Sequence, residues 1–174
     1  MANFLKFGLI AGLLYSVYMI GLQLSGSDLR FNTTLGFSLM LIVPIIFMVM
    51  AVRSERSMQE GLISFGEALK TSFLTYLIFI VITVIVLQLV TKMYTPDDWN
   101  RMLEIQRDMA ASMSEAVGMD QIQIDEAREA ITIQSIKDQT TGISGIFLMV
   151  LSNSFFGLIF SLIISAIMKK NPTA

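Results

Sequence analysis

The chain has 174 residues, of which 54% are hydrophobic and only 15% are charged, whereas a water-soluble domain carries charge on about a quarter of its residues. It contains no cysteine and no histidine, which excludes a disulfide framework, thiolate chemistry and the commonest metal ligand and general base near neutral pH. The formal net charge of −2, with no basic stripe, argues against a nucleic-acid partner.

Four long segments of the chain lack Asp, Glu, Lys and Arg altogether, namely residues 7–27, 31–52, 71–91 and 139–168. Each is long enough for a helix that crosses roughly 30 Å of hydrocarbon, which takes about 20 residues. We therefore predict an all-α membrane protein that forms one four-span domain over residues 1–174. The predicted spans are about 4–24, 35–52, 66–92 and 143–168, and an extramembrane helical hairpin at 95–139 lies between the third and the fourth. No cofactor and no metal are expected.

The first two spans carry features that concern helix packing. Gly8, Gly12 and Ser16 are four residues apart and therefore share one helix face, where small side chains let two backbones approach closely in lipid. Packing against a neighbouring span is the favoured interpretation, and a dimer seam is the alternative. In the second span, Pro44 removes one backbone hydrogen bond, and we expect a kink there.

A polar segment leads into the third span. Ser64 and Glu67 fit the capping box Ser-x-x-Glu, which satisfies free amides at a helix start. Glu67 also suits the positive end of the helix dipole, and it lies three residues from Lys70, close enough for an ion pair. These roles explain the segment as a helix start at the water boundary, without a functional intramembrane charge.

Polar side chains are rare inside the last two spans. Gln88 lies deep in the third span, and we expect it to hydrogen-bond to another helix. Asn153 lies inside the fourth span and needs a partner. Gly157, Ser161 and Ser165 recur every four residues and predict a second face for close packing.

Residues 95–139 hold ten of the fourteen acids of the chain and four of its twelve bases. Thr95 and Pro96 read as the N-cap and first position of a helix that continues to about Val117, and Gly118 reads as its stop. A second helix is predicted at about 120–137. The predicted seam between the two helices joins an apolar stripe, Trp99, Met102, Met109, Met113 and Val117, to a partner stripe, Ile122, Ala127, Ile131 and Ile136.

Two metal sites were weighed against this packing. Thioether sulfur is a soft ligand that would suit copper, but the spacing of the methionines favours a buried seam. Asp97 and Asp98 could contact a divalent cation, but neighbouring carboxylates at a helix start are more typical of capping.

Basic residues predict the orientation in the membrane. One side of the four spans carries six of them, Lys6, Arg53, Arg56, Lys70, Lys169 and Lys170, and the short loop on the other side carries Arg30 alone. Because Lys and Arg in short loops favour the cytoplasm, we predict a multi-pass protein of a bacterial inner membrane with both termini cytoplasmic and the hairpin outside.

The chain resembles a known protein family in three features, namely two stretches of sequence and the charged insertion between the last two spans. The stretches are Ile63-Ser-Phe-Gly-Glu-Ala-Leu-Lys70 and Gly157-Leu-Ile-Phe-Ser-Leu-Ile-Ile-Ser-Ala-Ile-Met-Lys-Lys170. The chain resembles the domain-of-unknown-function family 4199, small four-span membrane proteins found chiefly in Bacteroidota. The resemblance implies the four-span fold and supplies no activity. Glu67 stands where a lysine is common in the family, which makes it a weak catalytic candidate.

Three classes of function were compared. The favoured one is a structural or interaction protein of the lipid bilayer, which presents the acidic hairpin 95–139 to a protein partner, with a homo-oligomer left open. The alternative is a small transporter or channel subunit, for which Pro44, Gln88 and Asn153 are the support. An enzyme is not expected, because no ionisable side chain lies deep in a span and no nucleophile with a base can be identified.

Overall fold

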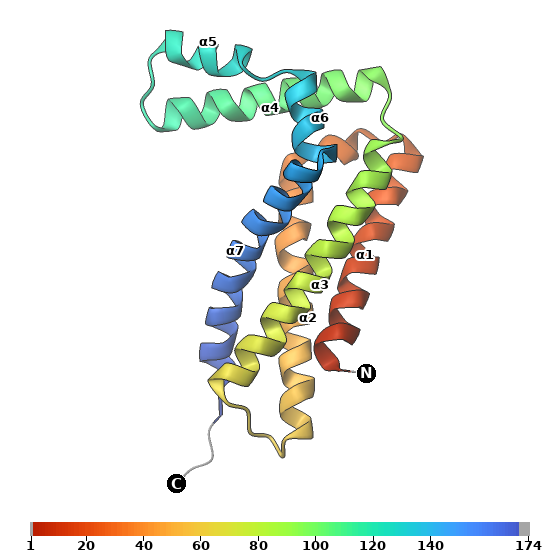
Figure 1. The fold of residues 1–174 in the computed structure, drawn as a ribbon, viewed down its shortest axis with the longest axis vertical. Helices are drawn as coiled ribbons and strands as arrows, with labels where there is room; N and C mark the ends of the chain where they lie inside the picture. Colours follow the sequence, from red (N-terminus) through yellow and green to blue (C-terminus); the bar gives the residue numbers. More distant parts are fainter. Residues whose placement is uncertain (1, 171–174) are drawn as a thin grey trace. The chain divides into compact units, whose positions relative to one another are not determined.

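The structure is a computed structural model that describes residues 2–170, and it is all-helical over that range. The elements follow in the order α1 (Asn3–Ser25), a short 3-10 turn η1 (Asp28–Phe31), α2 (Thr33–Met58), α3 (Phe65–Thr91), α4 (Pro96–Ala116), α5 (Gln121–Glu129), α6 (Ile133–Thr141) and α7 (Ile143–Met168) (Figure 1). The chain forms two compact units, which are described separately. Unit 1 comprises residues 2–87 and 148–170 of the described range, and unit 2 comprises residues 88–147.

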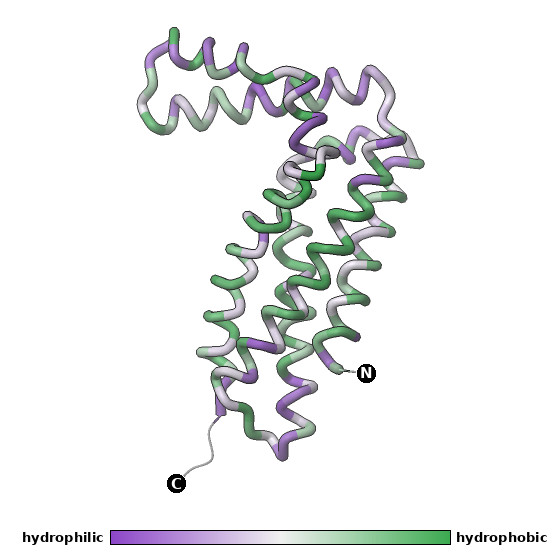
Figure 2. The backbone as a smooth tube through the Cα atoms, viewed as in Figure 1, coloured by the Kyte–Doolittle hydropathy of each residue, from purple (hydrophilic) through white to green (hydrophobic). Residues whose placement is uncertain are grey.

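Within residues 2–170, four helices, α1, α2, α3 and α7, are long and apolar enough to cross a membrane, and they coincide with the four predicted segments. Figure 2 shows these helices as mostly hydrophobic along their length. The second helix is longer than predicted, because it continues past Val52 to Met58. Its first turn is capped by Asn32, whose side-chain oxygen accepts a hydrogen bond of 2.9 Å from the amide of Leu35.

The core of unit 1 lies along α3. Tyr76 and Phe79 are fully buried on this helix, and the ring of Phe79 meets the ring of Tyr15 from α1 at a centroid distance of 5.7 Å. Small hydroxyl residues share the buried face. Ser72 donates a hydrogen bond of 2.8 Å to the carbonyl of Ala68, one turn earlier in the same helix. Such residues satisfy their own polar atoms and still allow close helix packing.

Short contacts join the loops at one end of unit 1. Ile63 and Lys170 form an antiparallel bridge, with N–H to O distances of 3.0 and 2.9 Å in the two directions. At the start of α1, Asn3 donates a hydrogen bond of 2.9 Å to the carboxylate of Glu55 on α2. The first and last described residues therefore lie at the same end of unit 1, as four long helices that alternate in direction require.

The first helix that lies wholly in unit 2, α4, begins with the predicted cap. Thr95 and Asp98 form a reciprocal capping box, in which the Asp98 carboxylate accepts a hydrogen bond of 2.8 Å from the amide of Thr95. The helix α4 ends in a Schellman motif, because Gly118 adopts a φ of +80° and the amide of Met119 donates 3.0 Å to the carbonyl of Ser114. The predicted start and stop of this helix are confirmed.

The single second helix predicted at 120–137 is wrong. The structure divides it into α5 and α6, which are separated at residues 130–132. Thr132 is the N-cap of α6. Its hydroxyl accepts a hydrogen bond of 3.1 Å from the amide of Ser135, and the hydroxyl of Ser135 accepts one of 3.0 Å from the amide of Thr132. These hydroxyls bond the backbone locally, which competes with continuous helix. The freed carbonyl of Ile131 accepts two hydrogen bonds from the guanidinium of Arg107 on α4, at 3.1 and 3.2 Å.

Candidate interaction surface

The small residues predicted for close packing lie between helices of unit 1. A methyl group placed on Gly8 would lie 2.7 Å from the Cβ of Ile78, and one on Gly12 would lie 2.9 Å from the Cβ of Ile82. Both positions therefore bring α1 against α3. On α7, a methyl group on Gly157 would overlap the ring of Tyr76, so that α7 also approaches α3 at a glycine. The geometry places these residues in intramolecular contacts.

The two serines that follow Gly157 on α7 are fully buried. Ser161 donates a hydrogen bond of 2.7 Å to the carbonyl of Gly157, and Ser165 donates one of 2.6 Å to the carbonyl of Ser161. Their hydroxyls are therefore engaged within the helix, which allows them to act as small packing residues in an apolar environment.

The two amides that were assigned to the interior of the spans use different partners. Asn153 donates a hydrogen bond of 2.7 Å to the carbonyl of Met149 in its own helix. Gln88 belongs to unit 2 and donates to the backbone carbonyl of Thr140 on α6. Gln88 thus joins the end of α3 to α6, and the structure gives the two amides no common ligand.

The segment before α3 has the geometry of a cap. One carboxylate oxygen of Glu67 accepts hydrogen bonds from the hydroxyl and the amide of Ser64, at 2.8 and 3.1 Å, and the amide of Glu67 donates 3.3 Å to the hydroxyl of Ser64. Lys70 is exposed and lines the same pocket as Glu67. These hydrogen bonds join Glu67 to Ser64, which identifies Glu67 as part of the helix start.

That pocket is an open cavity of about 280 Å³ at the end of unit 1 where α1 starts and α2 ends. Its polar rim includes Asn3, Glu55, Glu67 and Lys70, and its apolar lining includes Met58. Asn3 is anchored from two sides, because the hydroxyl of Ser54 donates 3.1 Å to its side-chain oxygen. Sequence reasoning missed this cluster, since its members are about fifty residues apart and no local pattern links them.

The apolar seam predicted between the hairpin helices is wrong over the second half of α4, although two of its predicted members, Trp99 and Ile136, are buried. The residues of α4 that are buried after its first turn are Ala111 and Ser114, and α5 contributes Ile124. The second half of the predicted stripe is open instead: Met109 is 48% exposed, Met113 68% and Val117 72%. At about 100° per residue, Ala111 lies on the opposite side of α4 from Met109, so α5 packs on the small residues and leaves the stripe uncovered.

Charged side chains hold the α5 side of this hairpin. Arg128 on α5 forms an exposed ion pair of 3.2 Å with Asp108 on α4. Together with Asp125 and Glu129, the arginines at 107 and 128 line a shallow cavity of about 340 Å³. Arg107 reaches the loop carbonyl before α6, a contact that no motif in the sequence announced. The charged side of unit 2 is therefore formed by α5 and the side of α4 that faces it.

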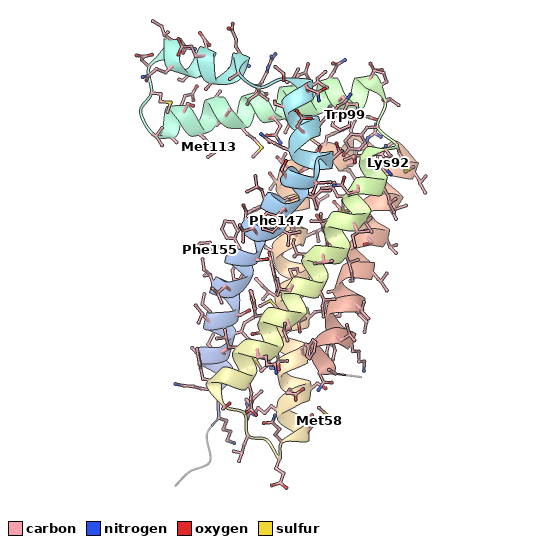
Figure 3. All side chains as sticks on the ribbon, in the orientation of Figure 1. Met58, Lys92, Trp99, Met113, Phe147 and Phe155 are labelled. Carbon is pink, nitrogen blue, oxygen red and sulfur yellow. The ribbon has the colours of Figure 1, made fainter. Side chains whose placement is uncertain are left out.

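An aromatic group marks the place where α4 begins. The ring of Trp99 meets the ring of Tyr94 at a centroid distance of 5.2 Å, and the ammonium of Lys137 from α6 lies 5.1 Å from the Trp99 centroid. Trp99 is 9% exposed, and Figure 3 shows it at the start of α4, with Met113 near the other end of the helix. The cation–π contact of Lys137 links α6 to α4, and the aromatic contact packs Tyr94, in the segment before α4, against Trp99.

Within residues 2–170, four helices are long and apolar enough to cross a membrane, as in a multi-pass α-helical membrane protein. The family model described as "Protein of unknown function (DUF4199)" matches residues 6–170, nearly the whole chain. The chain belongs to this family, as its resemblance predicted. Neither a curated protein nor a solved structure matches the chain.

Proposed function

We propose that the protein is a non-catalytic interaction module of a bacterial inner membrane, in which four spans anchor unit 2 and its acidic side binds a protein partner. The observation that carries the proposal is the distribution of charge. Unit 2 holds ten acids and five bases, and α5 exposes three of these acids, Asp125, Glu126 and Glu129, beside the cavity formed with Arg107 and Arg128. A surface with charges of both signs favours recognition of a protein partner by charge complementarity.

Positive charge supports an outward orientation for unit 2. The end of unit 1 that carries the start of α1 and the bridge at Lys170 also carries Arg53, Arg56 and Lys70. Placing this basic end in the cytoplasm puts both termini there and unit 2 on the opposite side of the membrane.

The absence of cysteine makes the orientation easy to test. Ser57→Cys and Ser112→Cys introduce single thiols at exposed positions, one near the basic end and one on α4. In spheroplasts, a membrane-impermeant maleimide should label the variant at position 112 directly and the variant at position 57 only after the membrane is permeabilised. The reverse pattern would refute the orientation.

A transporter or channel subunit has less support. Asn153 bonds its own helix, and Gln88 bonds a backbone carbonyl in unit 2, so the polar residues that suggested a pathway have structural uses. Within residues 2–170, the buried polar side chains of unit 1 are all uncharged, whereas transport pathways usually carry buried ionisable groups.

Partner binding is tested by affinity purification from native membranes in mild detergent. The full-length protein is compared with two variants. One lacks residues 95–139, and the other, D125N/E126Q/E129Q, removes the three negative charges of α5 and keeps Arg128. Glu60→Gln is the matched control, because it removes an exposed acid from unit 1. A partner retained by the full-length protein and by the control, but lost by both unit 2 variants, supports the proposal. A partner set that is the same for all four proteins refutes it.

A further inference from the structure

The apolar stripe of α4 that α5 leaves uncovered requires an explanation, because it lies outside the four spans. Met109, Met113 and Val117 are spaced by four residues and form one exposed face. We propose that this stripe lies on the bilayer surface, so that α4 is an interfacial helix with its apolar face in the headgroup region.

The distribution of charge along α4 agrees with a lipid contact. At about 100° per residue, the charged residues that follow the first turn fall outside the stripe, namely Arg101, Glu104, Arg107, Asp108 and Glu115. From residue 109 to residue 117 the stripe is therefore a charge-free strip about 12 Å long, at the end of a helix of 21 residues. Interfacial helices have this separation of apolar and charged faces.

Chain connectivity places a bilayer next to unit 2. Only residues 92–95 separate the end of α3 from the start of α4, and Gly142 alone separates α6 from α7. Because α3 and α7 are long enough to cross the membrane, both ends of the α4–α6 segment are held at its surface. The pair Tyr94–Trp99 at this junction is typical of the aromatic belt at membrane interfaces.

A tethered helix needs little intrinsic affinity for lipid. The two spans hold α4 at a high effective concentration near the bilayer, so a modest apolar contact is sufficient. The polar side of the hairpin is acidic, which gives no attraction to anionic lipid. The contact therefore depends on apolar burial, and neutral lipid should support it at least as well as anionic lipid does. The α5 side remains available to a protein.

The test measures whether a nitroxide label on α4 is exposed to lipid or to water. Met113→Cys and Val117→Cys place labels on the stripe, and Glu115→Cys, about 200° from position 113, is the control on the opposite side of the helix. Each full-length variant is labelled and placed as a single copy in a phosphatidylcholine nanodisc. The accessibility of each label to oxygen, which enriches in lipid, and to a water-soluble nickel complex is then measured.

We expect the ratio of oxygen to nickel accessibility to be severalfold higher at positions 113 and 117 than at 115. Replacing part of the phosphatidylcholine with phosphatidylglycerol should leave this difference unchanged or reduce it. Equal ratios at the three positions would show a hairpin that projects into water and would overturn the proposal. Low accessibility to both reagents at 113 would show a protein contact and would also overturn it. The nanodisc contains no partner protein, so the result is independent of the function proposed for the acidic side.

Discussion

The contact between α7 and α3 at Gly157 allows the packing of unit 1 to be tested with a single methyl group. Gly157→Ala adds a Cβ that would overlap the ring of Tyr76, and the obstruction comes from ring atoms close to the backbone and not from the tip of a flexible chain. Because Tyr76 is itself 1% exposed, its ring has little room to move. Alanine should therefore force the two helices apart.

The expected magnitude follows from two opposing terms. Overpacking of this kind costs about 1–3 kcal/mol, and the higher helix propensity of alanine returns about 1 kcal/mol. With the overlap placed in the upper half of the first range, Gly157→Ala should lower the free energy of unfolding by about 1–2 kcal/mol. The matched control is Gly21→Ala, since nothing lies within 4 Å of a methyl group at that position in α1. The control should be neutral or stabilising by up to about 1 kcal/mol.

The measurement is reversible unfolding in detergent micelles with sodium dodecyl sulfate, followed by far-ultraviolet circular dichroism. A double-mutant cycle with Tyr76→Ala then identifies the obstructing group. In the Tyr76→Ala background, Gly157→Ala should lose most of its cost, which gives a coupling energy of about 1–2 kcal/mol. If Gly157→Ala is as stable as Gly21→Ala, or if the cost persists without the Tyr76 ring, the helix contact described for α7 is wrong.

Three local features are tested by further substitutions, each with the same unfolding measurement. Glu60 is a non-glycine residue with a φ of +53°, so Glu60→Gly should stabilise the protein by about 1 kcal/mol, and a loss of stability would refute the assigned backbone. Thr132→Ala removes the cap of α6 and should cost about 1 kcal/mol, whereas Thr132→Ser should be close to neutral; equal effects would contradict the capping role. Across residues 2–170, no acceptor or donor reaches the buried hydroxyl of Thr83, so Thr83→Val should be neutral or stabilising by about 1 kcal/mol. Thr75→Val removes a hydroxyl that donates 2.7 Å to the Thr71 carbonyl, and it should be the less favourable of the two.

The spans could be predicted from sequence because a membrane imposes length and charge constraints that are local. A stretch such as 71–91, with no charged residue over one membrane thickness, has few alternatives to a spanning helix. The ends of α4 were also predictable, because Thr95 and Gly118 act through hydrogen bonds to residues within one turn. Each of these signals is contained in the segment that it determines.

The packing of unit 2 could not be predicted in the same way. The stripe Met109, Met113 and Val117 was correctly placed on one helix face, but the pattern does not say what covers that face. Its helical spacing predicted a buried seam with the second hairpin helix, because apolar residues at that spacing are typical of a packed face. In the structure, α5 packs on Ala111 and Ser114, where small side chains allow close approach, and the ion pair between Asp108 and Arg128 closes that side.

The stripe that α5 does not cover is also the apolar surface that the hairpin leaves open. In a water-soluble protein, an uncovered stripe of methionine and valine is a liability, because exposed apolar surface favours association. Beside a membrane, the stripe can contact lipid, so no protein segment is needed to cover this face of α4. A hairpin whose two faces differ so sharply, with charge toward α5 and none along the stripe, would be poorly suited to a position in bulk water. The pattern that failed as a prediction of helix pairing is therefore consistent with a helix that separates lipid from water.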